Sequence, residues 1–379
     1  MSSRVLRSAA TAMDEDARIM VAALNLARRG LGRVAPNPAV GALVVNNDMI
    51  VGRGFTGPGG RPHAEVLALQ QAAGEAKGAT LYVTLEPCSH HGRTPPCVDA
   101  VIAAGIARVV STIDDPEPRV AGSGHGRLRE AGIEVRTGIL AEAALRANLG
   151  HVLRVTRGRP MLTLKLAETA DGYAAGRRGA PRLMITDAPA TGRVHMLRAM
   201  HDAVMVGSGT ALADDPMLNV RLPRMEDCKP LRVVLDTHLV LPPSARLAVT
   251  ARDHPTLVIA GEGASMEAAA RLLDQGVEVE RVAFDNAGHL HLAAVLALLG
   301  ARGLTRVLCE GGPRLAAALI ARDLADEVVL FRSGKALGRA GLPALDSASC
   351  AALTDSARYR CAETGRIGPD AYRLYERVL

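Results

Sequence analysis

Aromatic side chains are scarce in this sequence. Its 379 residues include no Trp, three Phe and five Tyr, and aromatics make up 2% of the chain. Proteins that bind single-stranded nucleic acid usually stack the bases on aromatic side chains. The net charge of +6 and the pI near 9.2 therefore indicate an arginine-rich surface or anionic small-molecule substrates rather than a nucleic-acid partner.

Long apolar runs and closely spaced cysteines are also lacking. No apolar run reaches the roughly 18 residues that a membrane span needs. The first residues, MSSRVLRSAATAMDEDAR, lack the apolar segment of a secretory signal. Six cysteines spread over this length do not form the pattern of a disulfide framework. We therefore expect a protein of the reducing cytoplasm that does not bind membranes.

The length and the apolar periodicity predict two α/β domains, each large enough to bury its own core. In both halves short strand-like runs alternate with helix-like segments, which is typical of a largely parallel sheet covered on both faces. Near the start, 39–45 and 49–55 form a predicted hairpin joined by Asn46-Asn47-Asp48. The basic segment HVLRVTRGRP (151–160) interrupts the alternation, so we expect domains at 14–150 and 157–379.

The stretch TLEPCSHHGRTPPC (84–97) concentrates two cysteines and two histidines among prolines, and PHAE (62–65) precedes it. Zinc deaminases of nucleobases carry H-x-E followed by P-C and a second Cys. His63, Cys88 and Cys97 would be three zinc ligands, which leaves the fourth tetrahedral position open for water. Bound zinc lowers the pKa of that water to about 7. Glu65 is then available as the proton carrier.

Two other interpretations of these residues stay open on spacing alone. The site is a closed structural one if His90 or His91 supplies a fourth ligand, or the two cysteines are unrelated buried residues. Eight residues separate Cys88 from Cys97, whereas the general deaminase pattern has a short C-x-x-C.

A second candidate site lies at VLCEGGPRLAAALI (307–320). A predicted strand ends at Glu310, two glycines allow close approach of the backbone to a ligand, and Pro313 begins a helix. Such a helix N-terminus binds anions readily, although the same corner is also a common tight turn. Arg198 and Arg221 would clamp a phosphate, or else are surface arginines.

PCSHHGRTPPC, PNPAVG (36–41) and PHAE together resemble the deaminase half of the bacterial bifunctional riboflavin-biosynthesis (RibD) family, in which the long insert between the cysteines is a signature. The resemblance covers about residues 14–150 and implies a cytidine deaminase-like three-layer domain. It implies that Glu65 is the proton donor, that His63, Cys88 and Cys97 bind zinc, and that Asn37 and His90 contact the pyrimidine. Many members have His where this chain has Thr56.

The segments LKLAETADG, VMVGSGTALADDPMLNVR, VVLDTHLVLP and VLCEGGPRLAAALI resemble the reductase half of the same family over about residues 160–379. This implies a dihydrofolate reductase-like α/β domain. Met184 stands where many members have Trp. The preceding segment GRRGAPRL has one residue inserted, so no contact is assigned to Arg182. The implied NADPH contacts are Ala167, Met184, Thr210, Asp214, Thr237, Gly312, Pro313, Arg314, Leu315, Ala316, Ala317 and Ala318. The implied substrate contacts are Lys165, Arg198, Leu218, Arg221 and Glu310.

The resemblance implies a bifunctional enzyme with one zinc per chain and NADPH. The first domain would remove an amino group from 2,5-diamino-6-ribosylamino-4(3H)-pyrimidinone 5′-phosphate, and the second would reduce the ribosyl group of the product to ribityl. We expect a homo-oligomer with a small phosphorylated pyrimidine as substrate, and no nucleic acid or membrane partner. The alternatives are a deaminase of tRNA or single-stranded DNA with an unrelated second domain, and a non-catalytic zinc-stabilised binding module.

Overall fold

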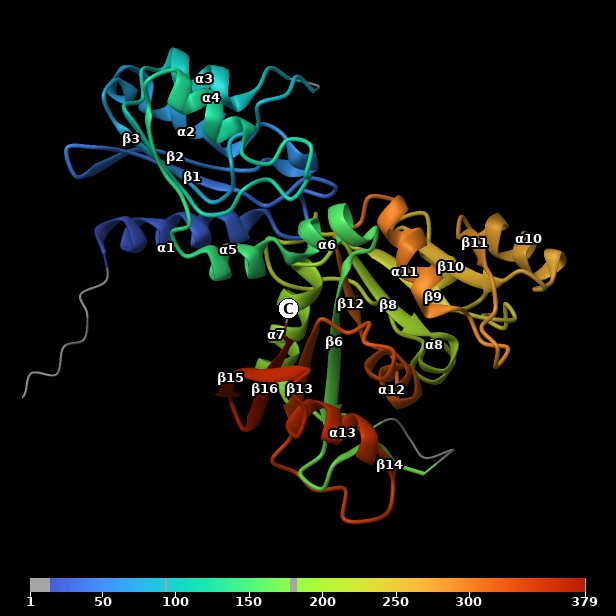
Figure 1. The fold of residues 1–379 in the computed structure, drawn as a ribbon. Coiled ribbons are helices and arrows are strands. Elements are labelled where there is room, and N and C mark those ends of the chain that lie inside the picture. The colour runs from blue at the N-terminus through green and yellow to red at the C-terminus, as the bar shows by residue number, and fades with distance from the viewer. Residues whose placement is uncertain (1–13, 93, 178–182, 379) are drawn as a thin grey trace, which may run out of the picture. The chain divides into compact units, whose positions relative to one another are not determined.

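The computed structural model describes residues 14–92, 94–177 and 183–378 (Figure 1). By the contacts between Cα atoms, the described chain divides into two compact units. The first contains residues 14–30 and 37–149, and the second contains residues 31–36 and 150–378. The division falls just before the segment 151–160, and that segment is largely helical, because α6 spans Leu149–Arg157.

The first unit is built on a five-stranded sheet in the order β2-β1-β3-β4-β5. Strand β1 is antiparallel to β2 and β3, whereas β3, β4 and β5 run parallel to one another. The strands are β1 (Gly41–Asn46), β2 (Met49–Phe55), β3 (Thr80–Val83), β4 (Arg108–Ser111) and β5 (Glu134–Arg136); the helices are α1 (Glu15–Ala27), α2 (Ala64–Ala72), α3 (Cys97–Ala103), α4 (Ser123–Glu130) and α5 (Ala141–Ala147).

Helices cover both faces of this sheet and form three layers. On one face, apolar side chains of α2, α3 and α4, such as Ala68, Val101 and Leu128, pack on the sheet. On the other face, Met20 of α1 and Ala144 of α5 do so. The predicted three-layer arrangement is confirmed. The predicted hairpin also forms, and its turn residues Asn47 and Asp48 have φ of 46° and 61°, as a type I′ turn requires.

The second unit has a nine-stranded sheet in the order β11-β10-β9-β8-β12-β6-β13-β16-β15. The strands from β11 to β13 are parallel, and β16 and β15 add an antiparallel edge. They are β6 (Met161–Glu168), β8 (Ala203–Gly207), β9 (Leu231–Leu235), β10 (Thr256–Gly261), β11 (Glu278–Val282), β12 (Arg306–Cys309), β13 (Glu327–Arg332), β15 (Tyr359–Ile367) and β16 (Asp370–Arg377). The short strands β7 (Tyr173–Ala175) and β14 (Leu342–Pro343) pair separately.

Helices lie on both faces of the larger sheet as well. One apolar cluster joins it to α11, α12 and α13, another joins it to α9 and α10, and α7 packs near β13 and β16. These helices are α7 (Ala188–Ala199), α8 (Ser208–Asp214), α9 (Arg246–Val249), α10 (Met266–Asp274), α11 (Leu292–Ala301), α12 (Pro313–Ala321) and α13 (Ser347–Thr354). Most of the predicted NADPH and substrate contacts lie on strands of this sheet or on the segments that follow them, whereas Arg198 lies in α7 and Met184 precedes that helix.

The edge hairpin of β15 and β16 was not among the predicted strands. Most residues of β15 are exposed, so the strand lacks the alternation of apolar and polar residues that identifies a half-buried strand.

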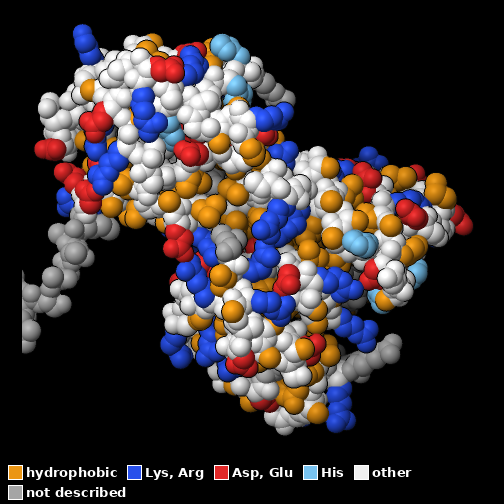
Figure 2. Space-filling view, in the orientation of Figure 1, with side chains coloured by type: hydrophobic (Ala, Val, Ile, Leu, Met, Phe, Trp, Pro, Cys, Tyr) orange, Lys and Arg blue, Asp and Glu red, His pale blue; other side chains and the backbone are white. Residues whose placement is uncertain are grey.

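Figure 2 shows Lys and Arg side chains spread over the visible face and interspersed with Asp and Glu. Within the described ranges, no helix is both long and apolar enough to cross a membrane.

Candidate functional site

Three side chains with metal-binding atoms converge in the first unit. The His63 Nδ1 atom lies 3.1 Å from Cys97 Sγ and 3.6 Å from Cys88 Sγ, and the three ligand atoms lie within 4.8 Å of one another. Cys97 begins α3 and His63 is the residue before α2. One nitrogen and two sulfur donors at this spacing form a donor set that Zn²⁺ prefers.

Hydrogen bonds among His63, Cys88 and Cys97 shift the pKa values of all three side chains. The pKa of Cys88 is lowered to about 4, because the Cys97 thiol donates a hydrogen bond to it and His63 lies beside it. The Cys97 backbone N–H also donates to Cys88 Sγ at 3.2 Å. The side-chain hydrogen bond between the two cysteines raises the pKa of Cys97, and the side-chain hydrogen bond to Cys88 raises the pKa of His63. Zinc would replace the shared protons, so the three residues fit the ion.

Glu65 lies in the first turn of α2 and is buried, with 4% of its surface exposed. Burial raises the pKa of its carboxyl group, and its side chain hydrogen-bonds to Cys97. A carboxyl group with a raised pKa beside a metal site can hold a proton near neutral pH and pass it on.

The two predicted pyrimidine contacts lie on loops around this cluster. Asn37 donates from Nδ2 to the Gly60 carbonyl at 3.0 Å, which leaves its Oδ1 atom available. Gly60 has φ of +87°, and a Cβ there would lie 2.1 Å from Asn37 Nδ2, so only glycine permits this arrangement. His90 is exposed in the loop between the cysteines.

Thr56 has a structural role in this chain. It is 3% exposed, its hydroxyl accepts a hydrogen bond from the Val40 N–H at 2.9 Å, and it donates to the Pro38 carbonyl at 3.0 Å. The hydroxyl therefore holds the loop that carries Asn37 and is not directed at a ligand.

Sequence reasoning missed Glu86, which precedes the Pro87-Cys88 pair. Its buried carboxylate accepts hydrogen bonds from the backbone N–H groups of Asp115 (2.8 Å), Gly122 (2.8 Å) and Gly124 (2.6 Å). It thereby ties the start of the cysteine loop to the segment that leads into α4. Its place inside TLEPC was the available signal, but partners about 30 residues away are not visible in the sequence.

In the second unit, the structure brings Arg198 and Glu310 together. Nε and Nη2 of Arg198 donate to the two carboxylate oxygens at 2.6 and 2.9 Å, and Nη1 donates to the Asn219 carbonyl at 2.9 Å. Burial alone would raise the pKa of Glu310, but the charge and hydrogen bonds of Arg198 lower it. The nearby Leu218 is buried with φ of +50°, and exposed Arg221 donates to Asn219 Oδ1.

The predicted NADPH contacts gather where parallel strands β8 and β12 end. Gly312 precedes α12, and a Cβ on it would lie 3.5 Å from Thr210 Oγ1 of α8. Asp214 ends α8, Thr237 follows β9 and Ala167 lies near the end of β6. Ligands of open α/β sheets bind outside the carboxyl ends of the strands.

Lys165 and Met184 complete the predicted contacts of this half. Lys165 of β6 places Nζ 5.9 Å from the centre of the Phe331 ring, and Met184 is 70% exposed. Residues 178–182 of the segment GRRGAPRL lie outside the described residues.

Comparisons with known proteins identify both units. The RibD C-terminal domain model matches residues 160–372, and the cytidine and deoxycytidylate deaminase zinc-binding region matches residues 13–113. The chain is similar to the riboflavin biosynthesis protein RibD of Escherichia coli, with 38% identity over 374 residues that cover 94% of this chain and 98% of that protein. The chain belongs to the RibD family.

Other RibD proteins agree with this assignment. RibD of Aquifex aeolicus is 39% identical and covers 96% of this chain and 98% of its own length. The solved structure of Acinetobacter baumannii RibD matches with a TM-score of 0.83 and 34% identity, and that of a Thermotoga maritima deaminase/reductase with 0.80 and 35%. Each covers 96% of this chain and 99% of the other.

The predicted function is confirmed at the level of the family. The protein is a bifunctional deaminase and reductase of riboflavin biosynthesis, and its cofactors are zinc and NADPH. This favours the enzymatic interpretation over a nucleic-acid deaminase and over a non-catalytic zinc module.

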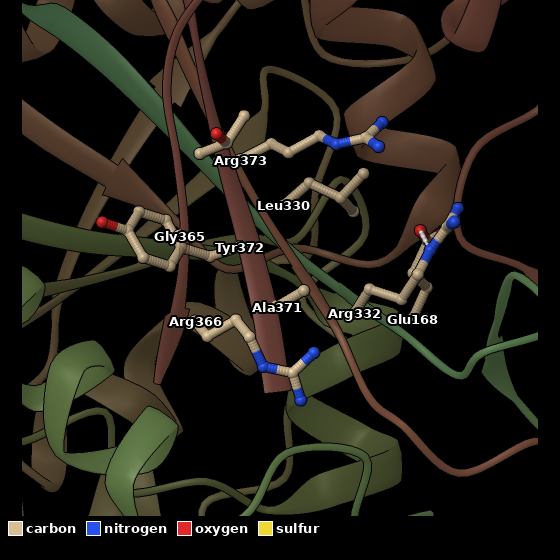
Figure 3. A pocket seen from close by; sticks show the side chains of 9 residues that line it. Glu168, Leu330, Arg332, Gly365, Arg366, Ala371, Tyr372 and Arg373 are labelled. Atoms are coloured by element: carbon tan, nitrogen blue, oxygen red, sulfur yellow. Dashed lines mark hydrogen bonds and ion pairs between the residues drawn. The ribbon is translucent and has the colours of Figure 1, made fainter. Parts of the chain in front are cut away.

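A cavity of about 410 Å³ in the second unit belongs to none of the predicted sites. Arg332, Arg366 and Arg373 line it, together with Glu168, to which Arg332 donates a hydrogen bond at 2.6 Å. Figure 3 shows the three guanidinium groups well apart and pointing in different directions.

Proposed function

We propose that the first unit hydrolytically deaminates 2,5-diamino-6-ribosylamino-4(3H)-pyrimidinone 5′-phosphate. We propose that the second unit then reduces the ribosyl group to ribityl with NADPH, giving 5-amino-6-(5-phosphoribitylamino)uracil. The observation that carries the first step is the His63–Cys88–Cys97 cluster with buried Glu65 beside it. A solved relative from Thermotoga maritima is named for both activities, on diaminohydroxyphosphoribosylaminopyrimidine and on 5-amino-6-(5-phosphoribosylamino)uracil.

In the deaminase, His63, Cys88 and Cys97 would hold one zinc ion. Zinc with three protein ligands supplies a water molecule of lowered pKa. Glu65 would hold a proton on its carboxyl group and deliver it to the ring nitrogen as hydroxide from the water adds to the ring carbon. It would then take the proton of the new hydroxyl group and pass it to the amino group, so that the C–N bond breaks and ammonia leaves. The buried position of Glu65 and its raised pKa support this role. Asn37 and His90 contact the pyrimidine ring, and the fixed orientation of the Asn37 amide supports its part.

In the reductase, the start of α12 binds the pyrophosphate of NADPH through backbone N–H groups, as helix N-termini do. Residues 312–318, with Ala167, Met184, Thr210, Asp214 and Thr237, form the cofactor site. Lys165, Arg198, Leu218, Arg221 and Glu310 hold the phosphorylated sugar, so that its C1′ atom receives the hydride. The arrangement of α8 and α12 at neighbouring strand ends supports this division.

The enzyme acts in the cytoplasm as a homo-oligomer, without nucleic acid. Light scattering of the purified chain tests the oligomeric state, and an electrophoretic shift assay with tRNA tests for nucleic-acid binding.

A two-stage assay with the purified chain tests the main proposal. Ammonia release from the pyrimidine phosphate should need zinc, and oxidation of NADPH should follow. Glu65→Gln should keep zinc and lose deaminase activity by about 10² or more, because a general acid/base is removed. Cys88→Ser should lose zinc. Full deamination by metal-free protein would refute the proposal, and loss of zinc from Glu65→Gln would make Glu65 a ligand instead.

A further inference from the structure

The segment 217–221 carries two of the predicted substrate contacts of the reductase, Leu218 and Arg221, and belongs to neither a helix nor a strand. Leu218 is buried with φ of +50°, a left-handed conformation that residues with a side chain rarely adopt. The side chain of Val220 packs in an apolar cluster with Ala199 of α7, so the segment lies against that helix. A backbone in this conformation keeps its shape only if the surrounding structure holds it.

Two side chains of α7 hold this segment by its backbone. His195 and Arg198 are three positions apart, so they lie on the same side of the helix. Nη1 of Arg198 donates to the Asn219 carbonyl at 2.9 Å. Nδ1 of His195 lies 3.2 Å from the backbone nitrogen of Arg221 and 3.1 Å from the Asn219 carbonyl oxygen. That carbonyl already accepts a hydrogen bond from Arg198, whereas a backbone N–H needs an acceptor. The imidazole therefore accepts the Arg221 N–H through Nδ1 and carries its own proton on Nε2.

The surroundings of His195 favour an imidazole without a positive charge. The residue is 6% exposed, and its burial lowers the pKa of the ring, as do the charges of Arg198 on the same helix and of Arg221 on the segment. The carboxylate of Glu310, which follows β12, acts in the opposite direction but does not outweigh them. A protonated imidazole would carry a hydrogen on Nδ1 and would have no lone pair for the Arg221 N–H. The hydrogen bond to the segment therefore needs the neutral ring that this environment favours.

We propose that His195 is a positioning residue of the reductase, which fixes the backbone at Arg221 so that the segment 217–221 is shaped to receive the phosphorylated sugar. This rests on the proposed reductase function. His195 acts through the segment and takes no part in hydride transfer, so its contribution is equal in the ground and transition states. Losing it should raise KM for the phosphorylated substrate and leave kcat nearly unchanged. The affinity for NADPH should stay that of the wild type, because the segment provides substrate contacts rather than cofactor contacts.

The test uses three substitutions that keep, displace or remove the acceptor at the Nδ1 position. In His195→Asn the amide oxygen can take the place of Nδ1, in His195→Gln the amide lies one methylene farther out, and in His195→Leu the acceptor is gone. KM for 5-amino-6-(5-phosphoribosylamino)uracil is measured with the full-length protein by following NADPH oxidation. KM should rise about tenfold in His195→Gln and His195→Leu, as one lost hydrogen bond to a buried N–H predicts, and should stay within about twofold of the wild type in His195→Asn.

A second buried histidine, just after the end of α7, separates positioning from a loss of stability. His201 is 2% exposed, and its ring nitrogens contact the Leu197 carbonyl at 2.6 Å and Thr163 Oγ1 at 3.0 Å. His201→Gln should lower Tm but leave KM unchanged, because KM does not depend on the fraction of the enzyme that is folded.

Three results would overturn the role of His195. They are a wild-type KM in His195→Leu, a rise in KM that His195→Asn shares in full, and an equal rise in His201→Gln. Absence of NADPH oxidation by the wild-type enzyme with this substrate would instead overturn the proposed reductase function.

Discussion

Replacing Arg198 with Ala should destabilise the second unit, because the substitution breaks a buried ion pair. The side chains of Arg198 and Glu310 are only 12% and 11% exposed, and their pairing is bidentate. Removing one member of a buried pair leaves an uncompensated charge and costs about 3–5 kcal/mol. For a unit of this size 1 kcal/mol corresponds to about 2–4 °C in Tm. We therefore expect Tm of the second unit to fall by about 6–20 °C.

A double-mutant cycle separates the pair from the individual side chains. Arg198→Ala, Glu310→Ala and the double variant are unfolded thermally, and Arg221→Ala serves as a control because that side chain is exposed. The double variant should be more stable than the sum of the single losses predicts, by about 1–3 kcal/mol. Arg221→Ala should change stability by less than about 0.5 kcal/mol while raising KM for the reductase substrate.

The pH dependence checks the same reasoning. Arg198 lowers the pKa of folded Glu310, so the pair stabilises the wild type above the ordinary Glu pKa of about 4.3 and this stabilisation disappears as pH falls. In Arg198→Ala the carboxyl group is buried without its partner, and its pKa should rise. The deficit of Arg198→Ala should therefore shrink on acidification. Additive losses in the cycle, within about 0.5 kcal/mol, would refute the view that the two residues act as a buried unit.

The remaining predictions concern both units. Gly312→Val should fold normally, since an added Cβ would be in ordinary contact 3.5 Å from Thr210. It should weaken NADPH binding in a fluorescence titration without changing ammonia release. Unaltered NADPH affinity would remove the start of α12 from the cofactor site. Glu86→Gln should weaken zinc binding in competition with a chelator, because an amide cannot accept all the hydrogen bonds that the carboxylate accepts from backbone N–H groups. A zinc affinity equal to that of the wild type would exclude a role of Glu86 in shaping the cysteine loop. Asp16→Asn should destabilise the first unit by up to about 2 kcal/mol at pH 7, because Arg108 lowers the pKa of Asp16 to about 2. This loss of stability should vanish as pH falls from about 4 to about 2. A loss that does not depend on pH would contradict this prediction. A fragment 150–379 should be more soluble and melt higher than 157–379, because Arg154 of α6 donates to the Gly300 carbonyl at 3.2 Å; equal behaviour would support a boundary at 157.

Local patterns were sufficient for much of the first site. His63 and Glu65 are two residues apart at the start of one helix, so their relation depends on backbone geometry that H-x-E encodes directly. The turn at Asn47 and Asp48 was predictable for the same reason, since these residue types tolerate the left-handed region. The family motifs in 84–97 then supplied the two cysteines, and the alternation of strands and helices supplied the fold class.

The tertiary structure decided which charged side chains are buried in ion pairs. Arg198 and Arg221 looked equivalent in the sequence, but Arg198 is bound to Glu310, 112 positions away, whereas Arg221 is exposed. Glu86 became important only through N–H groups of a distant segment. The strength of an ionic or hydrogen-bonding group depends on its burial and partners, and both are set by which distant segments fold against it.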